Sequence, residues 1–452
     1  MIPTSNDKSV IRWGAKSGRD SPFSVSDLIG NSPCKPVGRG NADIRAYCRL
    51  VLMSAGAGLL WCAHASAADG PGSFVSDATW NLDFRYRTEF VEEDGFDEDA
   101  WASTLRTRLS LQTGRYRGLQ ALVELSDVRE IGIDDFNAGA GATPDRTEFP
   151  VVADAQDTRL NRAWLGFSSR DAVELRAGRQ RIKLDNDRFV GNVGWRQNEQ
   201  TYDGGSLQWQ ADRWKLFYSY VSRVNRIFDS DLPAGEHDHD THLLNASFSI
   251  RDGHALTGYL YSIEDEDQQM FSNRTVGLRY TGSTSPAAQS AVKWLAEYAR
   301  QTDAGGNAED FDADYLHVRA DLSLAPSINL LAGFERLEGS RAPGKAFRTP
   351  LATLHAFNGW ADRFLTTPDR GLDDVYAGLG GAYGPVEWNV IWHRFDNETG
   401  GDRLGDEVDA SVSIQLHETT SALFKFAHVA ENDNRIAGAT KFWVMLSVAL
   451  PH

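Results

Sequence analysis

The chain has 452 residues, and acidic side chains outnumber basic ones to give a formal net charge of −17. This charge argues against a nucleic-acid partner, because an acidic surface and a phosphate backbone repel each other. A mean hydropathy of −0.42 excludes a bundle of apolar transmembrane helices. The three cysteines (Cys34, Cys48 and Cys62) all lie within residues 1–67, so the remainder of the chain has none for a disulfide.

The N-terminal segment has the pattern of a secretory signal. Residues 50–63 form a short apolar core that follows Arg45 and Arg49, and small residues precede a cleavage point after Ala67. We therefore predict a leader of residues 1–67 and a single mature domain of residues 68–452. The flank before the apolar core is long, so either translation begins downstream of Met1 or residues 1–44 form an extended leader.

From about residue 78, apolar and polar side chains alternate in short stretches that are separated by turn residues. In the first stretch Leu82, Phe84 and Tyr86 lie on one face, and Asp83 and Arg85 lie on the other. Alternation without a long apolar run is typical of a transmembrane β-barrel, whose apolar side chains meet lipid while polar ones face a lumen. We count about eighteen such stretches and predict an all-β fold, a transmembrane antiparallel β-barrel, with sixteen strands as the alternative.

A soluble β-sandwich also alternates and is the competing interpretation. Two features favour the barrel. Many inward positions carry long charged side chains, which suit a water-filled lumen. Aromatic residues also lie near the ends of the stretches, as in the girdles of a membrane barrel: Trp80, Trp101, Trp214, Tyr218, Tyr220, Tyr280, Trp294 and Tyr298. We therefore predict a location in the Gram-negative outer membrane, in contact with its lipid and lipopolysaccharide.

Short and long connections alternate along the chain, which sets the orientation of the barrel. The short ones read as periplasmic turns: 114–118, 168–171, 210–213, 251–254, 325–327, 381–385 and 417–420, with a longer Gly/Ser/Pro-rich connection at 281–290. The long ones read as extracellular loops: 92–101, 126–158, 179–203, 222–240, 264–273, 301–313, 336–371, 394–406 and 429–438.

The predicted extracellular loops are acidic. Residues 92–99 and 264–267 are rich in carboxylates, which we interpret as solvated loops, with divalent-cation binding as the alternative. His237, His239 and His242 lie in another acidic segment. There an unstructured loop is the prediction and metal binding the alternative, so we predict no metal site and no cofactor.

Basic side chains gather on the inward face of the predicted strands. Those of the first two strands are neighbours, and two more come from the fourth and fifth: Arg85, Arg87, Arg106, Arg108, Arg162 and Arg176. A guanidinium matches a carboxylate in shape and charge, so a row of them suits the passage of anions. The alternative is that these arginines pair with carboxylates across the barrel wall and hold it rigid.

Residues 178–204 form the segment richest in distinctive polar residues, and they read as either an in-folded constriction loop or a surface loop. This segment, the tetrapeptide of residues 84–87, and the motifs at residues 355–365 and 371–374 resemble the alginate-export outer-membrane porins. The resemblance extends over residues 78–450. It implies a monomeric eighteen-stranded barrel with an electropositive, arginine-lined constriction, in a family whose best-known member exports the polyuronate alginate.

Carried onto this sequence, the resemblance implies a solute path that contains six arginines, with three aspartates that pair with them: Arg85, Arg87, Arg106, Arg108, Arg179 and Arg196, with Asp83, Asp185 and Asp203. We predict a non-enzymatic channel for anionic saccharides or small organic anions. The alternatives are an outer-membrane lipid hydrolase and a structural barrel. No Gly-x-Ser-x-Gly motif is present, and so the sequence offers no catalytic residues for the hydrolase.

Overall fold

The computed structural model describes residues 72–451, apart from residues 170–171, 288–289, 326 and 431–435. The expected leader of residues 1–67 lies outside this range. None of the helices among the described residues is long and apolar enough to cross a membrane. The described chain begins with a short helix, α2 (Ser73–Ser76), and has two 3-10 turns, η2 (Gln269–Phe271) and η3 (Leu354–Ala356).

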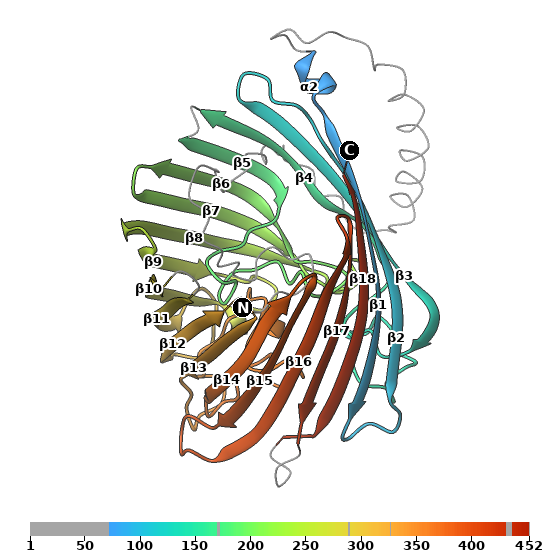
Figure 1. The fold of residues 1–452 in the computed structure, drawn as a ribbon, viewed down its shortest axis with the longest axis vertical. Coiled ribbons are helices and arrows are strands. Elements are labelled where there is room, and N and C mark those ends of the chain that lie inside the picture. The colour runs from blue at the N-terminus through green and yellow to red at the C-terminus, as the bar shows by residue number, and fades with distance from the viewer. Residues whose placement is uncertain (1–71, 170–171, 288–289, 326, 431–435, 452) are drawn as a thin grey trace.

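The described residues form eighteen β-strands in one antiparallel sheet (Figure 1). The strands are β1 (Thr79–Glu93), β2 (Ala100–Gln112), β3 (Leu119–Asp135), β4 (Asp157–Ser169), β5 (Val173–Gln180), β6 (Thr201–Ala211), β7 (Trp214–Asn225), β8 (Glu236–Arg251), β9 (His254–Ile263), β10 (Asn273–Ala287), β11 (Ser290–Asp303), β12 (Asp312–Ala325), β13 (Ile328–Leu337), β14 (Leu372–Tyr383), β15 (Val386–Asp396), β16 (Arg403–His417), β17 (Thr420–Val429) and β18 (Ala439–Pro451).

The sheet closes on itself. Each strand pairs with its neighbours in sequence, and β1 also pairs with β18, in a register that places Leu82 opposite Leu450. Closure leaves no strand edge unpaired, which a bilayer requires because lipid offers no hydrogen bonds to backbone groups. The predicted eighteen-stranded barrel is therefore confirmed for the described part of the chain.

The outer surface of the barrel is apolar and its interior is polar. Large side chains at alternate positions, such as Leu109, Leu278 and Val318, are exposed, although a soluble protein would bury them. The charged side chains between them, such as Arg108 and Arg279, point inward and are buried. This is the face alternation that the sequence predicted, and an exposed apolar belt of this kind requires lipid around it.

Three predicted connections are partly wrong because the strands extend further than expected. β3 continues to Asp135, so residues 126–135 of the expected loop 126–158 are strand. β10 and β11 pair through residues 281–287 and 290–295, so the expected connection at 281–290 is mostly strand. β8 begins at Glu236, so the expected unstructured histidine segment is also strand. Residues 281–285 and 236–242 have no alternation of apolar and polar residues, whereas ladder hydrogen bonds form between backbone groups and need no apolar side chains.

Candidate pore constriction

Residues 181–200, which connect β5 to β6, fold into the barrel, and Figure 1 shows this green segment inside the ring of strands. Phe189 is their apolar anchor. Its ring centroid lies 5.2 Å from that of Tyr259 and 5.2 Å from that of Tyr315, two inward-facing side chains of β9 and β12. Ile182, Leu184 and Val190 are buried in the same cluster. The segment thus carries its own apolar face into a polar lumen, and the aromatic side chains of the wall receive it.

A second segment, residues 338–371 between β13 and β14, meets the first inside the barrel. The Gly191 N–H donates to the Leu351 carbonyl at 2.8 Å, and the Thr353 N–H donates to the Asp187 carbonyl at 3.0 Å. A Cβ atom on Gly191 would lie 2.2 Å from the Thr353 hydroxyl, so only glycine permits this close approach. The two segments form one layer across the lumen.

Two arginines of β1 hold this layer against the barrel wall. Arg85 donates to the Gly194 carbonyl at 2.8 Å and to the Gln197 side chain at 2.9 Å. Arg87 donates to the Trp195 carbonyl at 2.7 Å, and its guanidinium lies 4.4 Å from the centroid of the Trp195 ring. These buried cations satisfy carbonyl groups of the in-folded segment that would otherwise lack partners.

Glu199 is the anionic centre of the same layer. It is fully buried and accepts hydrogen bonds from Arg181, and from the amides of Asn161 and Asn192 at 2.6 Å each. Arg108 lies 3.4 Å away. Burial alone would raise the pKa of Glu199, but Arg108 and Arg181 overcome this effect and hold it well below its ordinary value. Glu199 is therefore ionised and fixes the end of the segment to the wall.

His355 occupies the centre of the layer. Its Nδ1 contacts Asp362 at 2.7 Å and its Nε2 contacts the Lys425 ammonium at 2.6 Å, so Nδ1–H donates and Nε2 accepts. Burial, opposed by the charge of Asp362, lowers the pKa of His355 to about 3, so the ring is neutral. The Lys425 ammonium also lies 3.7 Å from the Trp360 ring centroid and 4.2 Å from that of Trp195.

Two chambers flank this layer, and His355 lies in the walls of both. The strand ends that line the inner chamber lead to the predicted periplasmic turns. The outer chamber is lined by residues of the predicted extracellular connections, among them Ile227, Phe228 and Thr366. The layer of in-folded segments therefore lies between the two chambers and is the candidate constriction.

The chambers differ in charge. The described wall of the outer chamber carries six cations and two carboxylates: Arg188, Arg196, Arg226, Arg348, Arg363 and Lys441, with Glu93 and Asp362. That of the inner chamber carries five cations and four carboxylates: Arg85, Arg279, Lys293, Arg319 and Lys425, with Asp187, Asp321, Glu335 and Asp374. The outer chamber is thus strongly electropositive, whereas the inner one is nearly balanced.

Arg226 and Arg348 are the cations of the outer chamber that have no carboxylate within ion-pair distance among the described residues, whereas Arg188 and Arg196, for example, are paired with Glu335 and Asp362. Arg348 instead donates to the Met270 carbonyl at 3.3 Å, and its buried Nε has no hydrogen-bond partner in the described part of the chain. Burial lowers the pKa of Arg226, and Asp265 opposes that effect. The sequence did not predict either arginine as part of the site. Both lie in loops, where no alternation of apolar and polar residues shows which way a side chain points.

The family of the chain follows from its sequence as well as its fold. A family model described as "Alginate export" matches residues 76–327, more than half of the chain. The chain belongs to the alginate export family. The family and the barrel together make it an outer-membrane porin of Gram-negative bacteria. No curated protein matches it.

Solved structures share the barrel of this alginate export family member. Acinetobacter baumannii OccAB2 matches with a TM-score of 0.65 and 15% identity, over 84% of this chain and 99% of that chain. Pseudomonas aeruginosa OccK9 (OpdG) matches with a TM-score of 0.65 and 14% identity, over 84% and 100%. Pseudomonas aeruginosa OccK5 (OpdH) gives 0.62 and 14%, over 84% and 99%. At these identities the likeness shows the fold alone.

The structure of this alginate export family member brings most of the predicted path residues into ion pairs or loop contacts. The pairs are Arg106–Asp83, Arg162–Glu124, Arg176–Glu174, Arg179–Asp203 and Arg196–Asp362. Asp185 instead accepts a hydrogen bond from Asn245 at 2.7 Å. Of the eight predicted arginines, Arg85 lines the inner chamber and Arg196 the outer one. The role of the whole set in solute selection stays a prediction.

Truncation of the aromatic anchor should loosen the constriction of this alginate export family member. Phe189→Ala removes a buried ring, which costs about 3–5 kcal/mol of packing energy in a typical core. We expect higher single-channel conductance and faster proteolysis within residues 181–200. The control is Phe424→Ala, on the lipid-facing side of β17, where 40% of the side chain is exposed. Equal conductance in both variants and the wild type would show that Phe189 does not hold the loop.

Proposed function

We propose that this protein is a monomeric channel for the diffusion of anionic solutes across the outer membrane, either saccharides that carry carboxylates, such as polyuronates, or small organic anions. The observation that carries the proposal is the charge of the outer chamber, where cations outnumber carboxylates and Arg226 and Arg348 lack carboxylate partners among the described residues. A solute carboxylate can bind such guanidinium groups and then exchange to a neighbouring cation.

Hydrogen-bonding groups support a saccharide. Thr366 and Thr367 line the outer chamber, and Asn329 lines the inner one, which provides donors and acceptors for hydroxyl groups.

Conductance in planar lipid bilayers tests this function. Under a KCl gradient we expect a reversal potential of the sign given by Cl⁻ permeation, and we expect an oligouronate to reduce the current in a concentration-dependent way. A neutral oligosaccharide of the same length is the matched control and should reduce the current less. A cation-selective channel would contradict the proposal. A barrel without measurable conductance would also contradict it and would support an enzymatic or structural role.

A further inference from the structure

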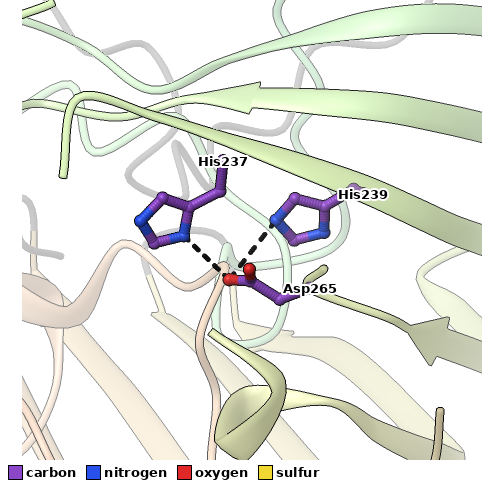
Figure 2. Close-up of side chains that lie close together, drawn as sticks. All are labelled: His237, His239 and Asp265. Atoms are coloured by element: carbon purple, nitrogen blue, oxygen red, sulfur yellow. Dashed lines mark hydrogen bonds and ion pairs between the residues drawn. The ribbon is translucent and has the colours of Figure 1, made fainter. Parts of the chain in front are cut away.

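Two histidines of β8 and one aspartate of the following extracellular loop meet outside the constriction (Figure 2). One donor atom from each of His237, His239 and Asp265 lies within 4.8 Å of the others. The three side chains are 6%, 4% and 2% exposed. His237 and His239 are two residues apart in one strand, so their rings lie on the same face of it. Asp265 faces them from the β9–β10 connection.

Both rings direct a nitrogen at the same carboxylate oxygen, as Figure 2 shows. The Nδ1 atom of His237 lies 2.8 Å from Oδ2 of Asp265, and the Nε2 atom of His239 lies 3.6 Å from it. In a tetrahedral zinc site, metal–ligand bonds of 2.0–2.1 Å place neighbouring donor atoms roughly 3.3 Å apart. The two observed separations bracket this value, so small side-chain movements would bring the donor atoms to a metal ion.

The other hydrogen bonds of His239 and Asp265 orient the atoms that would bind a metal ion, Nε2 and Oδ2. Nδ1 of His239 contacts the Thr241 hydroxyl at 3.1 Å, whereas its buried Nε2 has no hydrogen-bond partner among the residues that the structure describes. When Nδ1–H donates to Thr241, the lone pair of Nε2 faces the carboxylate, an arrangement that is repulsive until a cation lies between them. On Asp265, Oδ1 accepts the backbone N–H groups of Asp267 and Gln268, so Oδ2 is the oxygen that faces the histidines. Its present hydrogen bond with Nδ1 of His237 is the contact that a metal ion would replace, with the Nδ1 proton released or moved to Nε2.

The backbone around the cluster is already fixed. His239 and Asp265 pair through an antiparallel bridge, and the Asp240 N–H donates to the Glu264 carbonyl at 3.0 Å. The surrounding charges include Asp238 and Asp267, which attract a cation, and Arg226, which opposes it. The site is therefore organised before any ion binds, which lowers the entropic cost of binding.

The geometry points to a binding site for a divalent first-row transition-metal ion, with Zn²⁺ the best match, formed by His237, His239 and Asp265. Imidazole nitrogen with one carboxylate suits Zn²⁺, Ni²⁺ and Cu²⁺ better than Ca²⁺ or Mg²⁺, which prefer oxygen ligands. Three protein ligands leave a further position for water. The bound ion would join β8 to the β9–β10 connection at the extracellular end of the barrel.

Isothermal titration calorimetry with ZnCl₂ tests this site, using the full chain in detergent, without a polyhistidine tag and after treatment with a chelator. We expect saturable Zn²⁺ binding that His239→Ala and Asp265→Asn each weaken by more than ~10–100-fold, the usual cost of losing only a partner of a ligand. His242→Ala is the matched control, because that ring lies in the same strand, is exposed and contacts Tyr218 instead. The cysteines of residues 1–67 are common to all variants and do not affect the comparison.

The electron paramagnetic resonance spectrum of the Cu²⁺-loaded protein supplies a second readout that does not depend on affinity. We expect hyperfine structure from two imidazole nitrogens in the wild type and in His242→Ala, and from one in His239→Ala. Channel conductance shows that each variant is folded. Zn²⁺ affinity that is equal in the wild type and His239→Ala, a loss confined to His242→Ala, or no saturable binding would each overturn the inference.

Discussion

Reversing the charge of Arg226 and Arg348 together should abolish the anion preference of the channel. Arg226→Glu with Arg348→Glu leaves the described wall of the outer chamber with four cations and four carboxylates, in place of six and two. Coulomb's law gives about 0.6 kcal/mol for unit charges roughly 7 Å apart in water, and the double substitution changes four units of charge. Four units amount to about 2.4 kcal/mol, and screening by salt over this distance reduces this energy by roughly half. We therefore expect the anion-to-cation permeability ratio, measured from the reversal potential, to fall on the order of tenfold.

The matched control changes the same charge elsewhere. Arg300 and Arg394 lie on the outward faces of β11 and β15, and each pairs with an aspartate at the surface. Arg300→Glu with Arg394→Glu should leave the permeability ratio unchanged, because these charges are separated from the lumen by the barrel wall. An equal fall in both double variants would mean that net charge of the whole protein, rather than the outer chamber, sets the selectivity. An unchanged ratio in the first variant would remove Arg226 and Arg348 from the solute path.

Neutralising Glu199 should release the constriction. Glu199→Gln leaves Arg108 and Arg181 buried or half-buried without their shared anion, and breaking one side of a buried ion pair costs about 3–5 kcal/mol. We expect residues 181–200 to detach from the wall, with higher and noisier single-channel conductance. Glu98→Gln, at an exposed position between β1 and β2, is the control. A variant that keeps the wild-type conductance would show that the segment is held by its other contacts alone.

The same carboxylate should keep its charge in mild acid. Since the pKa of Glu199 is held well below the ordinary value, its contribution to stability is fully present above about pH 4.3, the value expected for an unfolded chain, and is lost only as the pH falls through the lower folded value. Lowering the pH from 7 to 5 therefore should not protonate Glu199 in the wild type. We expect this group to cause no rise in single-channel conductance of the kind expected for Glu199→Gln.

Much of the barrel was predictable because each strand must satisfy one local rule. Leu82, Phe84 and Tyr86 alternate with Asp83 and Arg85 because lipid and water lie on opposite sides of the wall. This alternation of apolar and polar residues ends beyond the bilayer, where both faces of a strand meet polar surroundings. Strand β8 therefore was not recognised at its extracellular end, although the spacing of His237 and His239 already had the period of a strand.

The candidate site was only partly predictable. The alternation along a strand shows which way a side chain points, but it does not show which distant segment that side chain contacts. The face alternation correctly placed Arg85 and Arg108 inside the barrel. It could not show that residues 181–200 would fold over them and use them as hydrogen-bond donors, since that depends on contacts between segments far apart in sequence. Residues 178–204 did carry a signal, because a segment so rich in Arg, Asn and Gln needs many buried partners.

The ion pairs that hold the in-folded segments bear on how the proposed solute path would discriminate between solutes. Glu199, Asp362 and Glu335 each bind cations and amides or imidazoles that come from different segments, so no single contact can shift without the others. For the solute path proposed above, a layer braced in this way would not adapt its width to the molecule that enters. The solute would then bear the energy of fitting, because it must shed water and straighten to pass, and a stiff extended chain would be favoured over a coiled one of equal mass.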